Sequence, residues 1–394
     1  MTTAFHTPAA LRACLIAACC ALAAPGALAI NGSQLGGYGI KNAGMGGASI
    51  ALPLDASAAA NNPAGMAFVP SSFIANIVVL QGEASSNFVL PDNKFNVTVG
   101  QLAPEGGINY VISPEVTLGF SVSGGGASAD FGRPLLPVPG AQTAVSTQVA
   151  LEFIPNMTWK PRSDLALGAG LVLAQQQFSA QGVLAVTPGG VVGVPGHGIQ
   201  TASGVGARIG VLWRATAQLA LGATYKTLTP MGPLGEYAKD ILAYSEGHSD
   251  IPPEFGVGIA WKPADAVTLA ADWMLIGYSK VKLMQDPNGP LWQDQPVLRL
   301  GLAWDDSAAW TLRTGASRNR RPMDSSRVLQ NFLTPVIFET SYTAGATLRL
   351  DPTSDISMSL EFNPATTLEG TGPSTGSSMR NEGYVLRLGY QKLF

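Results

Sequence analysis

The chain has 394 residues, and only 12% of them are charged while 46% are hydrophobic. This charged share is about half of that in a typical soluble protein, so the composition argues against an ordinary water-exposed surface. The net charge of −3 gives no basis for binding nucleic acid, which basic proteins attract through their overall charge.

The first 29 residues are predicted to form a secretory signal. Arg12 is followed by a short apolar run that ends in Ala27-Leu28-Ala29, the small-residue pattern of a cleavage site. We expect cleavage after Ala29; a lipoprotein signal with Cys19 as the lipidated residue is the alternative. All the cysteines lie in this segment, so we expect no disulfide and no thiolate site in the mature chain: Cys14, Cys19 and Cys20.

The next segment, 30–71, is too rich in glycine and alanine to build a core of its own. Its stretch AANNPAGMA (59–67) carries no charge and no nucleophile, and Pro63 prevents a regular helix. No run of 18 apolar residues occurs after the signal, so we expect no transmembrane helix. A chain that is this apolar but has no such runs is typical of a membrane β-barrel, in which apolar and polar residues alternate.

Alternation of this kind is clear in the stretches 267–275, 310–317 and 355–362. In the first of them one face is apolar and carries Val267, Leu269, Ala271, Trp273 and Leu275, whereas the other face includes Asp272. A period of two with one apolar face predicts a strand between two environments. A sandwich would show the same pattern, so the connections have to decide between the two folds.

The connections fall into two classes. Six are short and rich in Pro, Asp and Ser, which are ordinary turn residues: 113–115, 160–164, 214–218, 262–266, 304–308 and 351–355. Seven are longer: 83–106, 125–147, 178–199, 228–252, 281–295, 319–338 and 364–382. Thirteen connections predict an all-β, 14-stranded antiparallel transmembrane barrel over 72–394, with its first strand at about 72–82. Short turns at one end and long loops at the other are the habit of bacterial outer-membrane barrels.

The chain ends in a strand that supports this location. Tyr384, Leu386, Leu388 and Tyr390 share a face with the terminal Phe394. This spacing resembles the signal that the barrel assembly machinery reads, and we expect that machinery and outer-membrane lipid as partners. Lys392 departs from the apolar pattern, but a lysine can extend its amine to the membrane edge.

If the apolar face meets lipid, the opposite face lines the lumen. By parity this face carries charged residues of both signs: Glu152, Arg208, Asp272, Arg299, Arg313, Glu361 and Arg387. Mixed charges inside a barrel pair across it and hold its contents; direct ligand binding is the alternative. A 14-stranded barrel also has more room than its side chains fill, so we expect 30–71 to lie inside as a plug. There Asn61, Asn62 and Pro63, with Ala64 and Gly65, would fix the backbone, and Gly44–Gly47 would let it rearrange.

Two of the long loops are unusually apolar. The first (178–199) carries Phe178, Val183 and Leu184. The second contains a stretch (231–250) predicted to form a short helix with one apolar stripe: Leu234, Tyr237, Ala238, Ile241 and Leu242. These residues, Ala238 excepted, are candidates for a surface on which a hydrophobic ligand leaves water. The alternative is that the loops pack against each other.

At this point the residues resemble a known family. The pattern AGMGGA (43–48), Asp-Ala-Ser (55–57) and NNPAGM (61–66), followed by a barrel that ends in Phe, is similar to the FadL/TodX transporters of long-chain fatty acids and aromatic hydrocarbons. The stretches 251–282, 291–323 and 332–350 are similar to later segments of the family, and NPAGM is the most specific element. The resemblance implies a plug that shields a hydrophobic pocket and a sideways exit through a kinked third strand. We place that kink at Gly124, Gly125 and Gly126. The family's late Pro-Asp-x-Asp-Arg stretch does not carry over, because this chain has RRPMDSSRV (320–328) there.

No feature of the mature chain predicts catalysis. Its two histidines, His197 and His248, lie in predicted loops with no metal-ligand spacing, and we expect no metal, cofactor or enzyme activity. The function that we expect is passive uptake of a hydrophobic small molecule, a fatty acid or an aromatic or aliphatic hydrocarbon, by a monomer. The alternatives are a structural or surface-exposed barrel whose loops bind a partner, and a hydrophilic porin. The expected plug and the apolar loops favour uptake.

Overall fold

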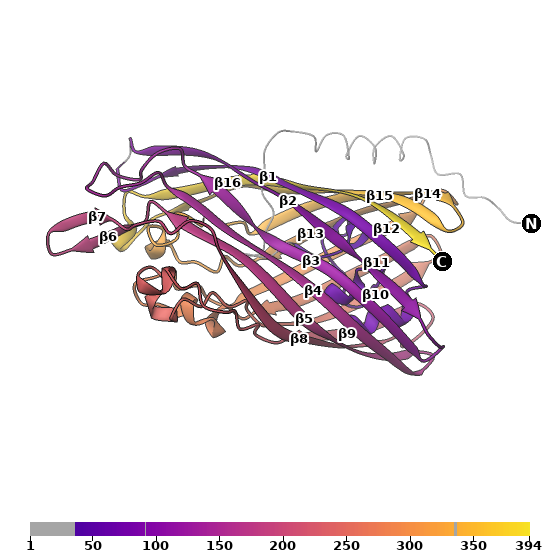
Figure 1. Ribbon diagram of the computed structural model, residues 1–394. Helices are drawn as coiled ribbons and strands as arrows, with labels where there is room; N and C mark the ends of the chain where they lie inside the picture. Colours follow the sequence, from indigo (N-terminus) through magenta and orange to yellow (C-terminus); the bar gives the residue numbers. More distant parts are fainter. Residues whose placement is uncertain (1–35, 91, 335–336) are drawn as a thin grey trace, which may run out of the picture.

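The computed structural model describes residues 36–90, 92–334 and 337–394, and it shows a closed antiparallel barrel (Figure 1). The expected signal (1–29) and the first residues of the expected plug (30–35) lie outside the described residues. Around the ring the strands follow in the order β1-β16-β15-β14-β13-β12-β11-β10-β9-β8-β5-β4-β3-β2, which makes 14 strands. The predicted fold class and strand count are therefore confirmed.

The barrel strands differ in length. They are β1 (Ser72–Asn87), β2 (Lys94–Val111), β3 (Val116–Asp130), β4 (Val145–Arg162), β5 (Leu165–Gln181), β8 (Gln200–Trp213), β9 (Leu219–Lys226), β10 (Glu254–Ala264), β11 (Val267–Ile276), β12 (Gln295–Asp305), β13 (Trp310–Asn319), β14 (Thr340–Asp351), β15 (Ser354–Glu369) and β16 (Ser378–Leu393). A separate hairpin, β6 (Leu184–Thr187) and β7 (Gly190–Gly193), projects from the loop between β5 and β8 (Figure 1).

Alternation of burial along the strands follows the predicted faces. In β16, Leu388 is 50% exposed on the outward face, whereas its neighbour Arg387 is fully buried. All the charged residues assigned to the lumen by parity are buried. The chain thus alternates between an apolar exterior and a polar interior, as a membrane barrel requires. Among the described residues, no helix is long and apolar enough to cross a membrane.

Two predicted loops were wrong in their extent. The stretch 83–106 is almost all strand, because β1 runs to Asn87 and β2 begins at Lys94; likewise β15 and β16 extend into 364–382. The prediction was wrong because these stretches contain Gly and Pro, which usually indicate loops. In β2, however, Pro104 stands where the pairing with β3 is interrupted, so its missing N–H costs no hydrogen bond to that neighbour.

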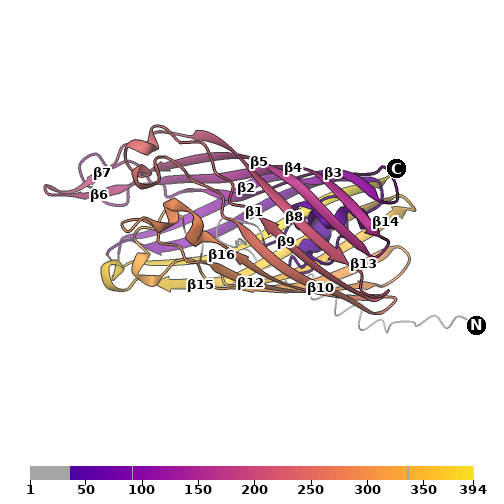
Figure 2. The same ribbon diagram turned by 90° about the horizontal axis from the view of Figure 1, so that it is seen from below.

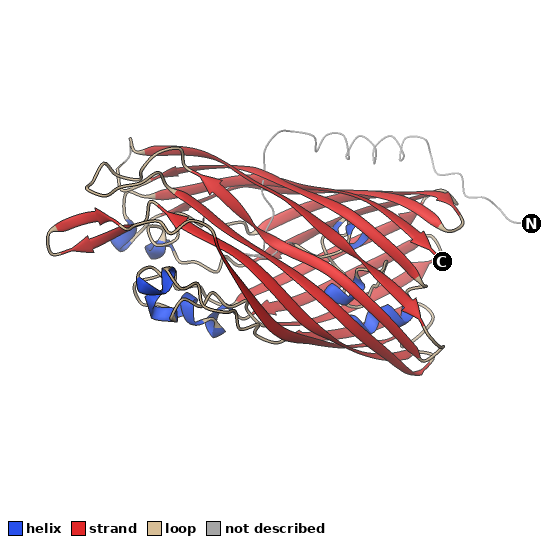
Figure 3. Cartoon of the chain, viewed as in Figure 1, coloured by secondary structure: helices blue, strands red, loops and turns tan. Residues whose placement is uncertain are grey.

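The barrel wall is taller on one side. β2 and β4 each have 18 residues, whereas β9 has only eight. Beyond the shorter strands, three long loops carry short 3₁₀ turns (Figure 3): η3 (Tyr237–Lys239), η4 (Ala243–Ser245), η5 (Tyr278–Lys280), η6 (Lys282–Gln285) and η7 (Ser325–Arg327); η8 (Gly372–Ser374) lies between β15 and β16. The helix predicted in 231–250 is thus wrong: the stretch forms the two separate turns η3 and η4.

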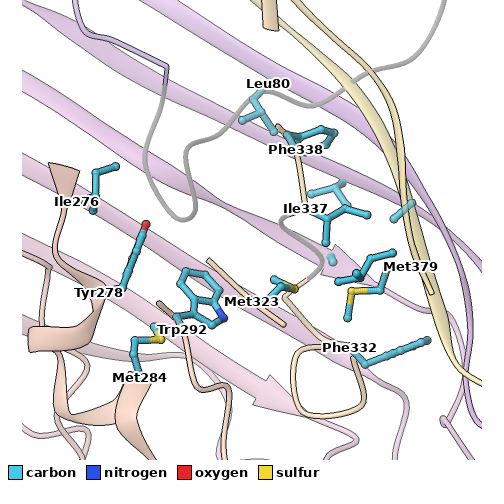
Figure 4. Close-up of a cluster of buried hydrophobic side chains, with 14 of the residues drawn as sticks. Leu80, Ile276, Tyr278, Met284, Trp292, Met323, Phe332, Ile337, Phe338 and Met379 are labelled. Carbon is cyan, nitrogen blue, oxygen red and sulfur yellow. The ribbon is translucent and has the colours of Figure 1, made fainter. Parts of the chain in front are cut away.

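The main hydrophobic cluster combines side chains of the wall and the long loops with a few of 36–71. Figure 4 shows part of it, with Tyr278, Met284, Trp292 and Phe332 reaching inward from loops. The ring of Phe332 lies 4.8 Å from Phe88 and 5.7 Å from Phe95, centroid to centroid. Wall and loop side chains therefore form one continuous core.

Candidate ligand cavity and its surroundings

Residues 36–71, here called the inner segment, lie against the inner wall of the barrel. They contain α2 (Ile40–Ala43), η1 (Ala58–Ala60) and η2 (Pro63–Phe68). Figures 1 and 2 both place these short helices within the ring of strands, at the end where the short turns and the C-terminus lie. α2 contacts β14, β15 and β16, whereas η2 contacts β3, β4, β5 and β8. The segment thereby bridges the lumen between distant parts of the wall.

The glycines of the inner segment allow close approach to the wall. Gly46 has a φ of 68°, and a Cβ there would lie 2.6 Å from the carbonyl oxygens of Leu300 and Ala316. A side chain at this position would collide with β12 and β13. The geometry thus gives this glycine a packing role, and the rearrangement expected of Gly44–Gly47 stays a prediction.

Asn61 and Asn62 hold two different parts of the inner segment. The Asn61 side chain donates to the Tyr38 carbonyl (2.8 Å) and accepts from the Tyr38 N–H (3.3 Å). Asn62 donates to the carbonyls of Ile50 (2.8 Å) and Val211 (3.0 Å), and it caps η2 by accepting from the N–H of Ala64 (3.1 Å). One amide therefore closes a loop within the segment, and the other ties the segment to β8.

Lumenal charges bind the backbone of the inner segment from several strands. The Asp272 carboxylate accepts from the N–H groups of Ser49 (2.7 Å) and Ile50 (3.0 Å). Guanidinium groups donate to backbone carbonyls: Arg208 to Asn61 (3.1 Å), Arg299 to Gly47 (3.4 Å) and Arg387 to Gly37 (3.2 Å). Of the other predicted lumenal charges, Glu361 lies 3.6 Å from Arg387, and Arg313 donates to Thr347 (2.7 Å). These contacts are of the kind expected for charges that hold the contents of a barrel.

A buried ion cluster includes two residues that sequence reasoning missed. Lys226 lies 2.9 Å from Glu152 and also contacts Glu254, and Glu254 in turn lies 2.8 Å from Arg208. All four side chains are buried. Lys226 is the last residue of β9 and Glu254 is the first residue of β10, and a long loop joins them. At the end of a strand, too few alternating residues follow to show which face a side chain is on. The signal that would have found them is the pairing of opposite charges on neighbouring strands.

The candidate ligand cavity borders this cluster at Glu152 and measures about 40 Å³. β3, β4 and β5, the two long loops before β10 and β12, and one residue of the inner segment contribute its lining: Tyr38, Gly124, Gly125, Gln148, Ala150, Glu152, Gln176, Asp250, Ile251, Pro252, Tyr278 and Met284. Tyr38, which Asn61 holds through its backbone, also lines a smaller cavity between the inner segment and Arg299. Tyr38 therefore borders both cavities.

None of the predicted loop residues lines that cavity. Instead Phe178, Leu234, Tyr237 and Leu242 are buried together in one cluster, with Ile241 half-buried at its side. The rings of Phe178 and Tyr237 meet edge to face at 5.0 Å between centroids, and the Tyr237 hydroxyl donates to Gly198. Val183 is half-buried, and Leu184 packs against the main cluster. This is the arrangement expected if the loops pack against each other.

Both loop histidines have local partners. The Nε2 of His197 lies 2.7 Å from Asp240, and the Nδ1 of His248 contacts the Met231 carbonyl at 2.6 Å. In the part of the chain that the structure describes, no group of three His, Cys, Asp or Glu side chains is arranged to hold a metal ion.

Gly124–Gly126 lie where the pairing of β2 with β3 is interrupted. Gly100 pairs with Ser128 and Gly106 with Val122. Between these pairs, 101–105 and 123–127 do not pair with each other, although the register is the same on both sides of the gap. Gly126 has a φ of 112°, and a Cβ there would collide with the Gln148 carbonyl. At Gly126 the interruption therefore uses a backbone conformation that other residues adopt only with strain.

A narrow groove follows this interruption. It is lined by side chains on both faces of the wall: Val78, Leu80, Gln101, Ala103, Gly124, Gly125, Gly126, Val149 and Leu151. Val78, Leu80 and Ala103 are buried toward the lumen, whereas Val149 and Leu151 alternate with the lumenal Glu152 and so face outward. Gly124 and Gly125 line both this groove and the candidate ligand cavity.

Comparisons with known proteins agree with this architecture. Solved structures of similar fold include the toluene transporter TodX of Pseudomonas putida (TM-score 0.70, 18% identity, covering 92% of this chain and 99% of that one) and the toluene transporter TbuX of Ralstonia pickettii (0.67, 16%, 91% and 99%). A FadL homologue of Pseudomonas aeruginosa is also similar (0.69, 17%, 93% and 99%). No curated protein matches the chain. The model of a family described as outer membrane protein transport protein (OMPP1/FadL/TodX) matches residues 15–368, so this outer-membrane chain belongs to that transport family.

Proposed function

We propose that the protein takes up hydrophobic small molecules passively, captures them in the candidate ligand cavity and releases them sideways between β2 and β3. The observation that supports this proposal is that Gly124 and Gly125 line both the cavity and the groove, a space of about 10 Å³ in the wall. A ligand that moves from the cavity past Gly124 and Gly125 into the groove passes from the lumen to the outward face without crossing the inner segment.

Capture requires the cavity to widen. Its volume of about 40 Å³ is well below the roughly 150 Å³ of an engineered apolar cavity that binds benzene. Met284 lines the cavity, and a flexible thioether chain adapts readily to a new neighbour. Burial supplies roughly 0.8 kcal/mol for each CH₂ group removed from water, which favours capture, and the concentration gradient of the ligand drives passive uptake.

In this proposal the inner segment acts as the plug. Its helices lie in the lumen at the end with the short turns, and its backbone is bonded to several strands. A ligand would therefore leave through the wall, and water-soluble solutes would be held back. The apolar loop cluster around Phe178 and Tyr237 would serve as a cover of the mouth, next to the site of capture.

Uptake into proteoliposomes tests the proposal directly. The toluene transporters of similar fold suggest radiolabelled toluene as one probe, and palmitate is the second. We expect uptake above that of empty liposomes, whereas swelling in sucrose stays at the background level. Rapid sucrose swelling without toluene or palmitate uptake would instead indicate a hydrophilic porin.

The sideways exit is tested by Gly124→Val together with Gly125→Val. Added side chains fill the groove, and at Gly124 a Cβ would already lie 2.6 Å from the Leu151 side chain. We expect slower uptake by a correctly assembled barrel. The matched control is Gly100→Val in the paired part of β2, where the nearest atom to a Cβ is 3.7 Å away. Equal uptake by both variants and the parent would place the exit elsewhere.

A further inference from the structure

The cavity has a polar side formed by two buried residues. Gln176 is 2% exposed and Glu152 is 4% exposed. Gln176 donates its Nε2 to Ser249 (3.2 Å), and Glu152 accepts from Lys226 through Oε1. The remaining polar atom of each side chain, Oε1 of Gln176 and Oε2 of Glu152, is buried and has no hydrogen-bond partner among the described residues.

Buried acceptors without a donor are costly and uncommon. A ligand that brings one hydroxyl into the cavity would supply a donor to one of these two oxygens. A bare hydrocarbon would instead cover these oxygens and leave them unbonded. The polar side of the cavity thus distinguishes between hydrophobic molecules that carry a donor and those that carry none.

The charges around the cavity disfavour an anion. Of the residues that line it, none is Lys, Arg or His, whereas Glu152 and Asp250 are carboxylates. The nearest cation behind the lining, Lys226, is already shared by Glu152 and Glu254. A ligand carboxylate would lie beside two like charges in a poorly solvated space, which raises its energy.

The lining of the cavity also includes three apolar residues, Ile251, Pro252 and Met284. We propose that the cavity takes a hydrophobic molecule with one neutral hydrogen-bond donor, an alcohol or a phenol, in preference to a bare hydrocarbon or a carboxylate. The donor hydroxyl lies at Gln176 and Glu152, and the apolar body lies against Ile251 and Met284. This assignment rests on the proposed function, because it names the class of molecule that the same cavity takes up.

Three probes that share one aromatic ring test the proposal: toluene, benzyl alcohol and benzoate. Binding to the purified full-length protein in detergent is measured by equilibrium dialysis, with protein-free micelles as the blank. Toluene is the more hydrophobic of the two neutral probes, so simple partition favours toluene. We expect the opposite order, with benzyl alcohol bound about tenfold more tightly than toluene and benzoate not bound.

Gln176→Met removes the acceptor and keeps a side chain of similar length. We expect it to weaken benzyl alcohol binding about fivefold and to leave toluene binding unchanged. Gln295→Met is the matched control, since Gln295 of β12 is also buried with an unpartnered Oε1 but does not line the cavity. It should leave both affinities at the parent values.

The outcomes separate this inference from the proposed function. Toluene bound as tightly as benzyl alcohol, or benzoate bound best, would overturn the donor preference while uptake of hydrophobic molecules stands. Failure of all three probes to bind would overturn both. The order of the three affinities in the parent protein decides the question even if Gln176→Met does not fold.

Discussion

The paired amides of the inner segment offer the sharpest test of how the lumen is closed. Asn61→Ala combined with Asn62→Ala removes five hydrogen bonds, two to the backbone of Tyr38 and one each to Ala64, Ile50 and Val211. Barrel strands pair with one another around the whole ring, so their pairing does not depend on these bonds. We therefore expect a folded barrel with a loosened inner segment.

The magnitude follows from the bonds that are lost. A buried hydrogen bond contributes about 1 kcal/mol net, and its unpaired partner costs about 1–3 kcal/mol. Neighbouring bonds are not additive, and water reaches some of the freed groups, so we take about 3 kcal/mol for the pair. That energy raises the population of the loosened segment by roughly a hundredfold.

Hydrogen exchange of peptides from 36–71, measured by mass spectrometry, reports this population directly. We expect faster exchange there with unchanged exchange in the strands, together with higher single-channel conductance or reduced toluene uptake. The control is Asn363→Ala, which removes a buried wall amide that accepts from Ser341. If exchange, conductance and uptake of the double variant all equal those of the parent, the amides do not hold the segment in place.

Further outcomes follow from the same structure. Lys226→Met should lower the unfolding free energy by about 3–5 kcal/mol, because it leaves Glu152 and Glu254 buried without their shared cation. Urea unfolding of the refolded barrel measures this loss, and an unfolding midpoint equal to that of the parent would contradict it. Lys239→Met, which removes an exposed pair with Glu236, should leave that midpoint unchanged. The mature protein purified from outer membranes should begin at Ile30, and intact-protein mass measures the cleavage after Ala29; a lipid-modified Cys19 at the N-terminus would refute it.

Alternation and turn chemistry determine much of the architecture from sequence alone. The side chain of each strand residue faces either the lipid or the lumen. A period of two in the sequence therefore shows which residues share a face, even when the neighbouring strands are not known. Asp272 and Arg387 were assigned to the lumen in this way, and both are buried there. Turns are equally local, and counting them predicted the 14 strands. Family motifs in 43–66 marked the inner segment for the same reason, since they are contiguous in the chain.

What only the tertiary structure decided depends on neighbours that are distant in sequence. The true length of β2 follows from its pairing with β1, which outweighs the loop signals of Pro104 and the glycines around it. Likewise the apolar character of Phe178 and Tyr237 predicts contact with a ligand, but the two rings contact each other. An apolar ring is removed from water equally well by a ligand or by another side chain, so the sequence cannot distinguish the two. The candidate ligand cavity combines Tyr38, Gly124 and Glu152 with loop residues up to Met284. No local pattern joins these positions, because the closure of the ring brings them together.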